Sequence, residues 1–77
     1  MLPELLEHLL FPLVDSPEGV KIDHLDTRKA DIFLISVSEG DRGHVLGRNG
    51  KTADALRTVM KETAASVDRE VVIDILD

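Results

Sequence analysis

The chain of 77 residues contains no cysteine, no tryptophan and no tyrosine, and only two phenylalanines, Phe11 and Phe33. Without cysteine it can form neither a disulfide framework nor a zinc site with thiolate ligands. It also cannot build the aromatic platforms on which RRM sheets and OB folds stack bases, since both phenylalanines are expected in the core. These absences exclude disulfide-rich secreted domains and aromatic base-stacking modules.

Long apolar segments and targeting signals are also absent. No hydrophobic run is long enough to span a bilayer. The apolar first fourteen residues are interrupted by two glutamates and follow no basic segment, which is not typical of a signal peptide. The three histidines, His8, His24 and His44, fall on different expected elements and share no metal-ligand spacing. The sequence therefore predicts a single cytoplasmic domain of residues 1–77 with no metal, no cofactor and no membrane partner.

Basic residues are few, and the formal net charge is −6. Nucleic-acid-binding domains are usually basic, so the total charge argues against such a partner. The distribution argues the other way, because five of the nine lysines and arginines lie between positions 42 and 61 beside a single acid, Asp54. Chance clustering of charges on a helix surface is one interpretation of this pattern. The other is that the basic segment, which stands in an otherwise acidic chain, binds a polyanion. The basic residues of this segment are Arg42, Arg48, Lys51, Arg57 and Lys61.

The N-terminal half predicts one helix and two strands. Leucines recur at helical spacing over residues 2–10, and Pro12 is expected to end or kink this helix. Alternation of apolar and charged residues over 20–23 indicates a half-buried strand that ends or bulges at Leu25, where the alternation slips. The β-branched run 31–38 indicates a central strand, and the short connection between the two strands favours an antiparallel pair.

The C-terminal half predicts two helices and a third strand. One helical turn is expected at 42–46, a longer helix at 51–66 and a final strand at 70–76, and Gly47 and Gly50 separate the two helices. The order is α-β-β-α-α-β, with a helical crossover between the last two strands. This order predicts an α+β fold in which helices pack on one face of a three-stranded mixed sheet.

The segment between the last two helices carries the chemistry. Gly47 and Gly50 allow a sharp turn and a close approach of another backbone. The helix that begins at Lys51 presents unpaired N–H groups and the positive end of its dipole to an anion. Arg48 and Lys51 oppose that dipole by about 0.3–1 kcal/mol each, so a sequence selected for stability alone would favour acids there. The pattern predicts a phosphate-binding loop, although an ordinary glycine-containing turn between helices would share it.

Gly50-Lys51-Thr52 also matches the end of a nucleotide-binding P-loop. That motif requires a glycine five residues before Gly50, where this chain has Val45, and it follows a strand directly. A chain of this length cannot supply the multi-stranded parallel sheet around such a site. The hydroxyl residues form no nucleophile elbow and the carboxylates are scattered, so the sequence predicts that the protein is not an enzyme.

The segment Val45-Leu46-Gly47-Arg48-Asn49-Gly50 resembles the V-I-G-x-x-G signature of KH domains, whose loop clamps the backbone of about four unpaired nucleotides. The element order resembles the type II arrangement of these domains. Over nearly its whole length the chain is similar to the small bacterial single-KH proteins of the KhpA family. It departs from the KH pattern at Ala53, where Ile or Leu is general, and at Pro12, which interrupts the first helix.

The resemblance implies a protein that binds single-stranded RNA, an RNA chaperone or post-transcriptional regulator. Gly47 and Gly50 would shape the clamp, while Arg48, Asn49 and the amide of Lys51 would face phosphates. Single-stranded DNA is an alternative ligand, because such a loop contacts the backbone more than the sugar. Few phosphates can be neutralised by one loop, so a shallow salt dependence is expected.

The resemblance also implies a groove beside the loop. Val45 and Leu46 would form its floor, although core packing is an equally good interpretation of both. Arg42, just before the loop, and Arg57, two turns into the following helix, are further expected phosphate contacts, and a solvated helix face is an alternative for Arg57. Other apolar residues expected in the groove are Ala53, Ile35 and Val37.

A second hypothesis is a protein-interaction module in which the KH fold serves chiefly to dimerise. The chain has more apolar residues than one layer of helices can bury. They are Leu2, Leu6, Leu13 and Val14 near its start, and Ile32 and Leu34 on the second face of the central strand. The resemblance implies homodimers, or heterodimers with a larger KH-containing protein of the KhpB or Jag-like type. The two hypotheses are compatible.

Overall fold

A computed structural model describes residues 1–76; Asp77, the last residue of the expected domain, lies outside the described residues. Three α-helices and three strands follow one another in the order α1-β1-β2-α2-α3-β3, with short 3₁₀ turns between them. This order and the mixed sheet confirm the predicted α+β fold. The bounds are α1 Leu2–Leu10, β1 Lys21–Asp26, β2 Ala30–Ser36, α2 Arg42–Leu46, α3 Lys51–Ser66 and β3 Glu70–Ile75.

Helix α1 buries one stripe of leucines and ends where proline requires it. Leu2, Leu6 and Leu10 recur every four residues and are all buried. Pro12 cannot continue the hydrogen-bonding pattern of an α-helix, and the chain tightens into a 3₁₀ turn at Phe11–Leu13, as the sequence predicted. Within the described part of the chain, no helix combines the length and the apolar character needed to cross a bilayer.

The sheet has the order β1-β2-β3, with β1 antiparallel and β3 parallel to the central strand β2. The register of β1 with β2 is one-to-one up to Asp26 paired with Asp31, so the expected strand end or bulge at Leu25 is wrong. The alternation slips because His24 takes an inward position: its ring stacks on Phe33 at 4.4 Å between centroids. Leu25 therefore faces the other side of the sheet and is 53% exposed.

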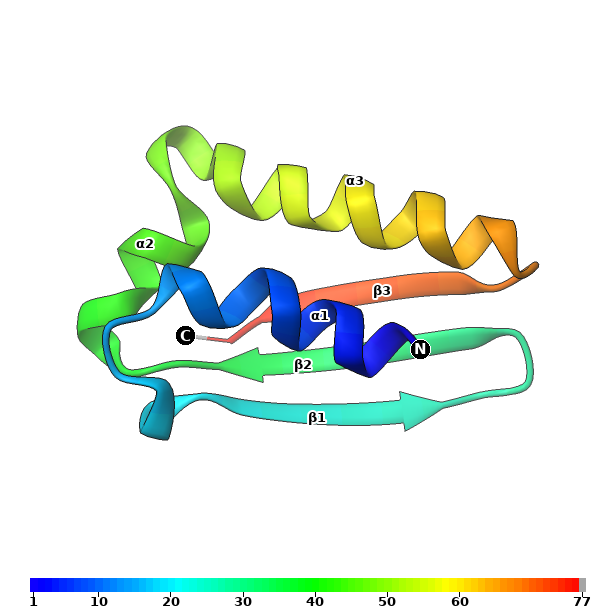
Figure 1. Ribbon diagram of the computed structural model, residues 1–77, viewed down its shortest axis with the longest axis horizontal. Coiled ribbons are helices and arrows are strands. Elements are labelled where there is room, and N and C mark those ends of the chain that lie inside the picture. Colours follow the sequence, from blue (N-terminus) through cyan, green and yellow to red (C-terminus); the bar gives the residue numbers. More distant parts are fainter. Residues whose placement is uncertain (77) are drawn as a thin grey trace.

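All three helices lie on one face of the sheet, with α1 and α3 running along it (Figure 1). Alternate residues of β2 and β3 point into this layer, where Phe33, Ile35, Val71 and Ile73 are buried. The other face of the sheet is uncovered. It carries one apolar row across the three strands, formed by Leu25, Ile32 and Val72.

A buried aspartate joins the ends of the three strands. Arg69 Nε donates to Asp31 Oδ2 at 2.6 Å, and His24 Nε2 lies 2.6 Å from Asp31 Oδ1. Arg69 Nη2 also donates to Asp26 Oδ1 at 2.7 Å. Burial is the largest single influence on the Asp31 pKa and raises it, but the hydrogen bonds and charges of Arg69 and His24 together outweigh burial and hold the pKa below its ordinary value. The ion pairs of Arg69 with Asp31 and Asp26 fix the β1–β2 turn to the start of β3.

Candidate nucleic-acid interface

The glycine loop, residues 47–50, connects α2 to α3 and stands out at one end of the molecule (Figure 1). Gly47 ends α2 with φ 74° and ψ 174°, and Gly50 precedes α3 with φ 74° and ψ 11°. Asn49 between them is left-handed, with φ 57° and ψ 27°, a conformation that asparagine tolerates better than most residues. The Gly50 N–H donates to the Gly47 carbonyl at 3.1 Å, so the loop is a closed turn.

The two glycines are required for different reasons. A Cβ on Gly47 would lie 2.1 Å from Thr52 Oγ1 and 2.8 Å from the Thr52 backbone nitrogen. A Cβ on Gly50 would meet nothing within 4 Å, so only its positive φ favours glycine. Gly47 thus lets the end of α2 approach the first turn of α3 closely.

Positive charge gathers where the loop meets α3. Arg48 and Lys51 are exposed, and neither forms an ion pair with any of residues 1–76. No side chain from that part of the chain caps the N-terminus of α3. The Lys51 N–H donates back to the Arg48 carbonyl, while the other N–H groups of the first turn have no side-chain cap and lie beside two mobile cations, an arrangement that suits phosphate oxygens.

Arg57 lies where α3 faces the edge strand β3. Its Nε donates to the Ile73 carbonyl at 3.2 Å, and its Nη1 lies 3.5 Å from Asp54 Oδ1 on the preceding turn. The edge of β3 opposite β2 is therefore partly covered by a guanidinium. The expected phosphate contact at Arg57 is thus half-buried beside a strand, away from the glycine loop.

The apolar residues expected in the groove divide into two groups. Val45, Ala53 and Ile35 are fully buried in the core and have no surface to offer a ligand. Leu46 and Val37 are half-buried. Of the two central-strand residues expected in the groove, Ile35 is therefore inaccessible to a ligand and Val37 is partly accessible, while the strand that Arg57 contacts is β3.

Arg42 and Asp41 lie at the start of α2, one helical turn before the loop. Arg42 is half-buried. Asp41 is buried, and its two carboxylate oxygens accept the N–H groups of Asp15 and Ser16 at 2.9 Å each. The hydrogen bond from Asp15 is the main cause that lowers the Asp41 pKa, against the opposing effect of burial. Asp41 therefore anchors α2, and with it the loop, to the segment after α1.

The sequence reasoning missed Asp41, because its partners are 25 and 26 positions away in the chain. His44 Nδ1 lies 3.4 Å from Asp41 Oδ1, and Asp15, Asp41 and His44 are the group of possible metal ligands among residues 1–76, with donor atoms within 4.8 Å of one another. Both Asp41 oxygens already accept hydrogen bonds from backbone amides, and these bonds explain the group of three side chains as a structural anchor.

A short helix, a turn with two glycines of positive φ and a longer helix, set against a mixed sheet with the order β1-β2-β3, define a KH domain of type II. The model of the KhpA/KhpB KH domain matches residues 3–75, and the chain belongs to this family. The resemblance noted in the sequence is confirmed.

Three relatives illustrate the family, each named RNA-binding protein KhpA. The chain is 42% identical to that of Streptomyces coelicolor over 77 residues, which cover 100% of this chain and 94% of the relative. It is 38% identical to that of Borreliella burgdorferi, over 96% of this chain and 90% of the relative. It is 32% identical to that of Bacillus subtilis, over 99% of this chain and 94% of the relative. These names agree with the prediction that the protein is not an enzyme, and no solved structure was found that matches the chain.

Proposed function

We propose that this chain binds single-stranded RNA in the cytoplasm through the glycine loop, with residues 1–77 acting as one KH domain. The observation that carries the proposal is the uncapped N-terminus of α3 beside the exposed cations Arg48 and Lys51. The names of the three KhpA relatives support RNA as the ligand.

The clamp would work by fitting two backbones together. Gly47 and Gly50 present no side chain, so a sugar–phosphate backbone can approach the loop closely. A phosphate there would accept charge-assisted hydrogen bonds from the side chains of Arg48 and Lys51. The Lys51 N–H, which was expected to face a phosphate, already donates to the Arg48 carbonyl. The side-chain amide of Asn49 would donate to the next phosphate.

The residues around the loop would support the ligand in different ways. Leu46, half-buried beside Gly47, would contact a ribose or base, while the buried Val45 would hold the end of α2 in place. Arg57 would meet the strand further along α3, and Arg42 would add charge before the loop. If about three phosphates are neutralised, the logarithm of the association constant should fall linearly with the logarithm of the salt concentration, with a slope of about −2.

The decisive experiment changes Arg48 and Asn49 together to aspartate. Both side chains are exposed, and aspartate tolerates the left-handed backbone at position 49, so the fold should be retained by circular dichroism. Fluorescence anisotropy with a labelled single-stranded RNA should show at least a tenfold loss of affinity. Lys21→Asp, an exposed lysine on the distant edge strand β1, is the matched control and should retain binding.

Unchanged affinity of the Arg48→Asp/Asn49→Asp protein would contradict the clamp. Competition with single-stranded DNA of the same sequence separates the two possible ligands, and stronger displacement by RNA is expected. A preference for duplex RNA would argue against a KH groove, because bases must be unpaired to enter it.

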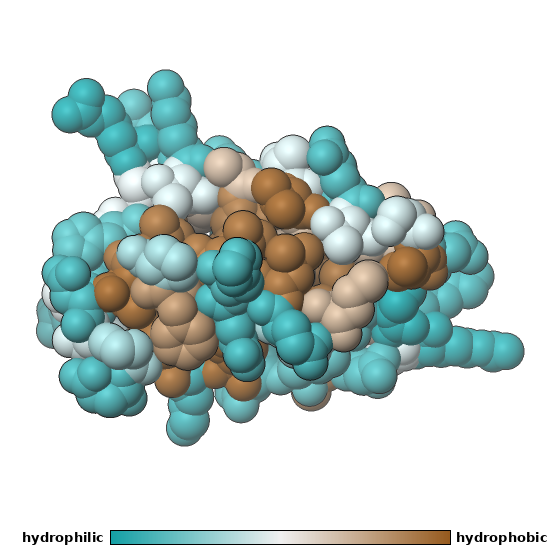
Figure 2. All heavy atoms as spheres, in the orientation of Figure 1, coloured by the Kyte–Doolittle hydropathy of each residue, from teal (hydrophilic) through white to brown (hydrophobic). Residues whose placement is uncertain are grey.

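A second proposal is that the protein acts as a dimer, as an RNA chaperone or post-transcriptional regulator with two clamps. An apolar depression of about 200 Å³ lies between α1 with its following turn and α3, lined by Leu9, Leu13, Ala55, Leu56 and Val59, with Thr52 at its edge. Figure 2 displays hydrophobic side chains gathered across the middle of this face. The partner would be a second copy of this chain or a larger KhpB or Jag-like protein. A dimer with two clamps would bind one RNA more tightly, because the second clamp would meet the same RNA at a high effective concentration.

The test of dimerisation is Val59→Asp. Val59 is 41% exposed, so the substitution should leave the fold intact and shift the sedimentation coefficient from dimer to monomer. Leu25→Asp on the uncovered face of the sheet is the control, and it should remain a dimer. A monomer for the wild type at every concentration, or dissociation by the Leu25 variant alone, would contradict this interface.

A further inference from the structure

The uncovered face of the sheet exposes apolar side chains on all three strands. Leu25 is 53% exposed and Val72 is 50% exposed, and they flank the half-buried Ile32 of the central strand. Leu34, two residues further along β2, is also half-buried. These four side chains form the sheet patch, which no helix covers because all three helices lie on the other face (Figure 1). A contiguous exposed apolar patch marks an interaction surface, whereas scattered apolar residues do not.

Two carboxylates flank the sheet patch at the level of Leu34. Asp23 of β1 and Asp74 of β3 are both in register with Leu34, one on each side of it. Both aspartates are exposed, and neither forms an ion pair with any of residues 1–76. Neighbouring strands lie about 4.8 Å apart, so Asp23 and Asp74 are separated by about 10 Å across the sheet patch.

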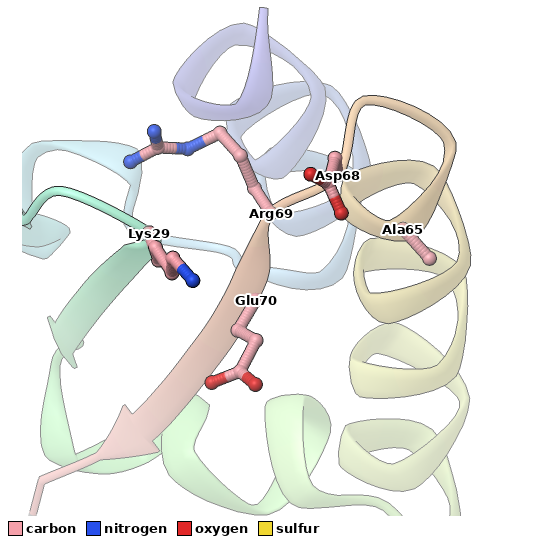
Figure 3. A pocket seen from close by; sticks show the side chains of 5 residues that line it. All are labelled: Lys29, Ala65, Asp68, Arg69 and Glu70. Carbon is pink, nitrogen blue, oxygen red and sulfur yellow. The ribbon is translucent and has the colours of Figure 1, made fainter.

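The charges at the two ends of the sheet do not neutralise this pair. At one end, the backbone N–H of Glu70 donates to the carbonyl of Lys29 at 2.8 Å, so a glutamate and a lysine lie together there. Arg69 directs its guanidinium away from Glu70, as Figure 3 shows. At the other end, Lys21 begins β1. Between these ends, the level of Leu34 carries carboxylates alone.

The dimensions of the sheet patch fit one α-helix that lies along β2. Ile32 and Leu34 are about 6.6 Å apart along the strand, close to the rise of about 6 Å between helix positions four residues apart. A helix with its side chains is about 10–12 Å wide, so its two flanks would reach Asp23 and Asp74. Lysine or arginine on both flanks would lay its aliphatic stem on apolar surface and bring its charge to a carboxylate.

Charge complementarity argues against other occupants of this face. The carboxylates of Asp23 and Asp74 would repel a phosphate backbone, and they would also repel the anionic surface of a membrane. In a symmetric dimer the same surface patch of each copy meets the other. A second copy would therefore bring two more unpaired carboxylates against this pair. A partner with an apolar stripe and positive flanks has no such conflict.

We propose that the uncovered face of the sheet binds an amphipathic helix of a partner protein, with lysine or arginine on both sides of its apolar stripe. The stripe packs on the sheet patch along β2, and the flanking cations pair with Asp23 on one side and Asp74 on the other. This surface does not include the glycine loop, so the helix binds whether or not the loop clamps RNA.

The probe is a fluorescein-labelled peptide built on the heptad Leu-Lys-Lys-Leu-Leu-Lys-Leu, which places an apolar stripe between lysines in a helix. It should bind the wild type in fluorescence anisotropy. The same peptide with glutamate in place of lysine should bind about tenfold more weakly, because like charges would meet. Asp23→Asn/Asp74→Asn should weaken the lysine peptide several-fold. Glu7→Gln/Glu62→Gln removes the same charge from exposed positions on α1 and α3, and this matched control should bind as the wild type does.

Leu25→Thr/Val72→Thr tests the apolar half of the surface. Both side chains are exposed and threonine suits a strand, so the fold should be retained by circular dichroism. The variant should bind the lysine peptide several-fold more weakly than the wild type. In the ¹⁵N-labelled wild type, the peptide should shift the amide signals of Leu25, Ile32 and Val72 most.

Four outcomes would overturn the proposal. Equal weakening by Asp23→Asn/Asp74→Asn and by the control pair would mean that only net charge attracts the peptide. Equal binding of the lysine and glutamate peptides would remove the role of the carboxylates. A change in the sedimentation coefficient of Leu25→Thr/Val72→Thr without peptide would make a second copy the occupant. Amide shifts on this face caused by single-stranded RNA would make RNA the occupant.

Discussion

Alanine at position 47 should destabilise the protein much more than alanine at position 50, although both glycines have a φ of 74°. The two sites differ in ψ and in what surrounds them. Gly47 combines its φ with a ψ of 174°, a region that only glycine occupies readily, whereas the ψ of 11° at Gly50 belongs to the ordinary left-handed region.

The magnitudes follow from the backbone and from the contacts of a new Cβ. The conformation of Gly47 costs a non-glycine residue about 1–3 kcal/mol. The Cβ would also lie 2.8 Å from the Thr52 backbone nitrogen, so the first turn of α3 must move, and a total of about 3 kcal/mol or more is expected. At Gly50 the space is open, and the left-handed conformation alone costs about 1–2 kcal/mol.

The assay is urea denaturation followed by far-ultraviolet circular dichroism, since the chain has no tryptophan or tyrosine for fluorescence. Gly47→Ala should show the lower midpoint. Adding Thr52→Ala to that variant should recover little stability, because the backbone nitrogen of residue 52 stays in place. Equal midpoints for Gly47→Ala and Gly50→Ala, or full recovery by Thr52→Ala, would refute the reasoning.

Three further predictions concern the charged residues. Acidification should destabilise the protein below about pH 4, because the pKa values of Asp31 and Asp41 are held below the ordinary 3.8. The stability that these two carboxylates contribute is complete above pH 3.8 and is lost as the pH falls through their lowered pKa values. Urea denaturation midpoints measured between about pH 3 and pH 6 would show this loss. Asp31→Asn should lower the free energy of unfolding by about 2 kcal/mol at neutral pH, because Arg69 loses a charged partner, and should flatten the acid dependence; an unchanged pH profile would contradict this assignment. Arg57→Ala should cost about 1 kcal/mol of stability through the lost bond to Ile73 and should weaken RNA binding measured by anisotropy; tighter binding would mean that Arg57 obstructs the groove.

The helices and the glycine loop could be predicted from the sequence because local rules determine them. Proline at position 12 ends α1 wherever the rest of the chain lies. The glycines at 47 and 50 mark the turn through their own backbone freedom. The family pattern in the same segment then identified the fold around the loop.

The contacts between distant segments could not be predicted in this way. Asp31 meets Arg69 across 38 positions, and no periodicity in the sequence records the pair. The inward turn of His24, which made β1 seem to end early, depends on Phe33 and Asp31 in the next strand. The placement of Arg57 on the edge of β3 likewise required the packing of α3 against the sheet.

The most direct test of the central claim is a titration of the ¹⁵N-labelled wild-type protein with a short single-stranded RNA, followed by amide chemical shifts. The clamp predicts that the largest changes fall on residues 47–52, with smaller ones along α3 toward Arg57. Largest changes on the uncovered face of the sheet, around Leu25, Ile32 and Val72, with the glycine loop unaffected, would contradict it.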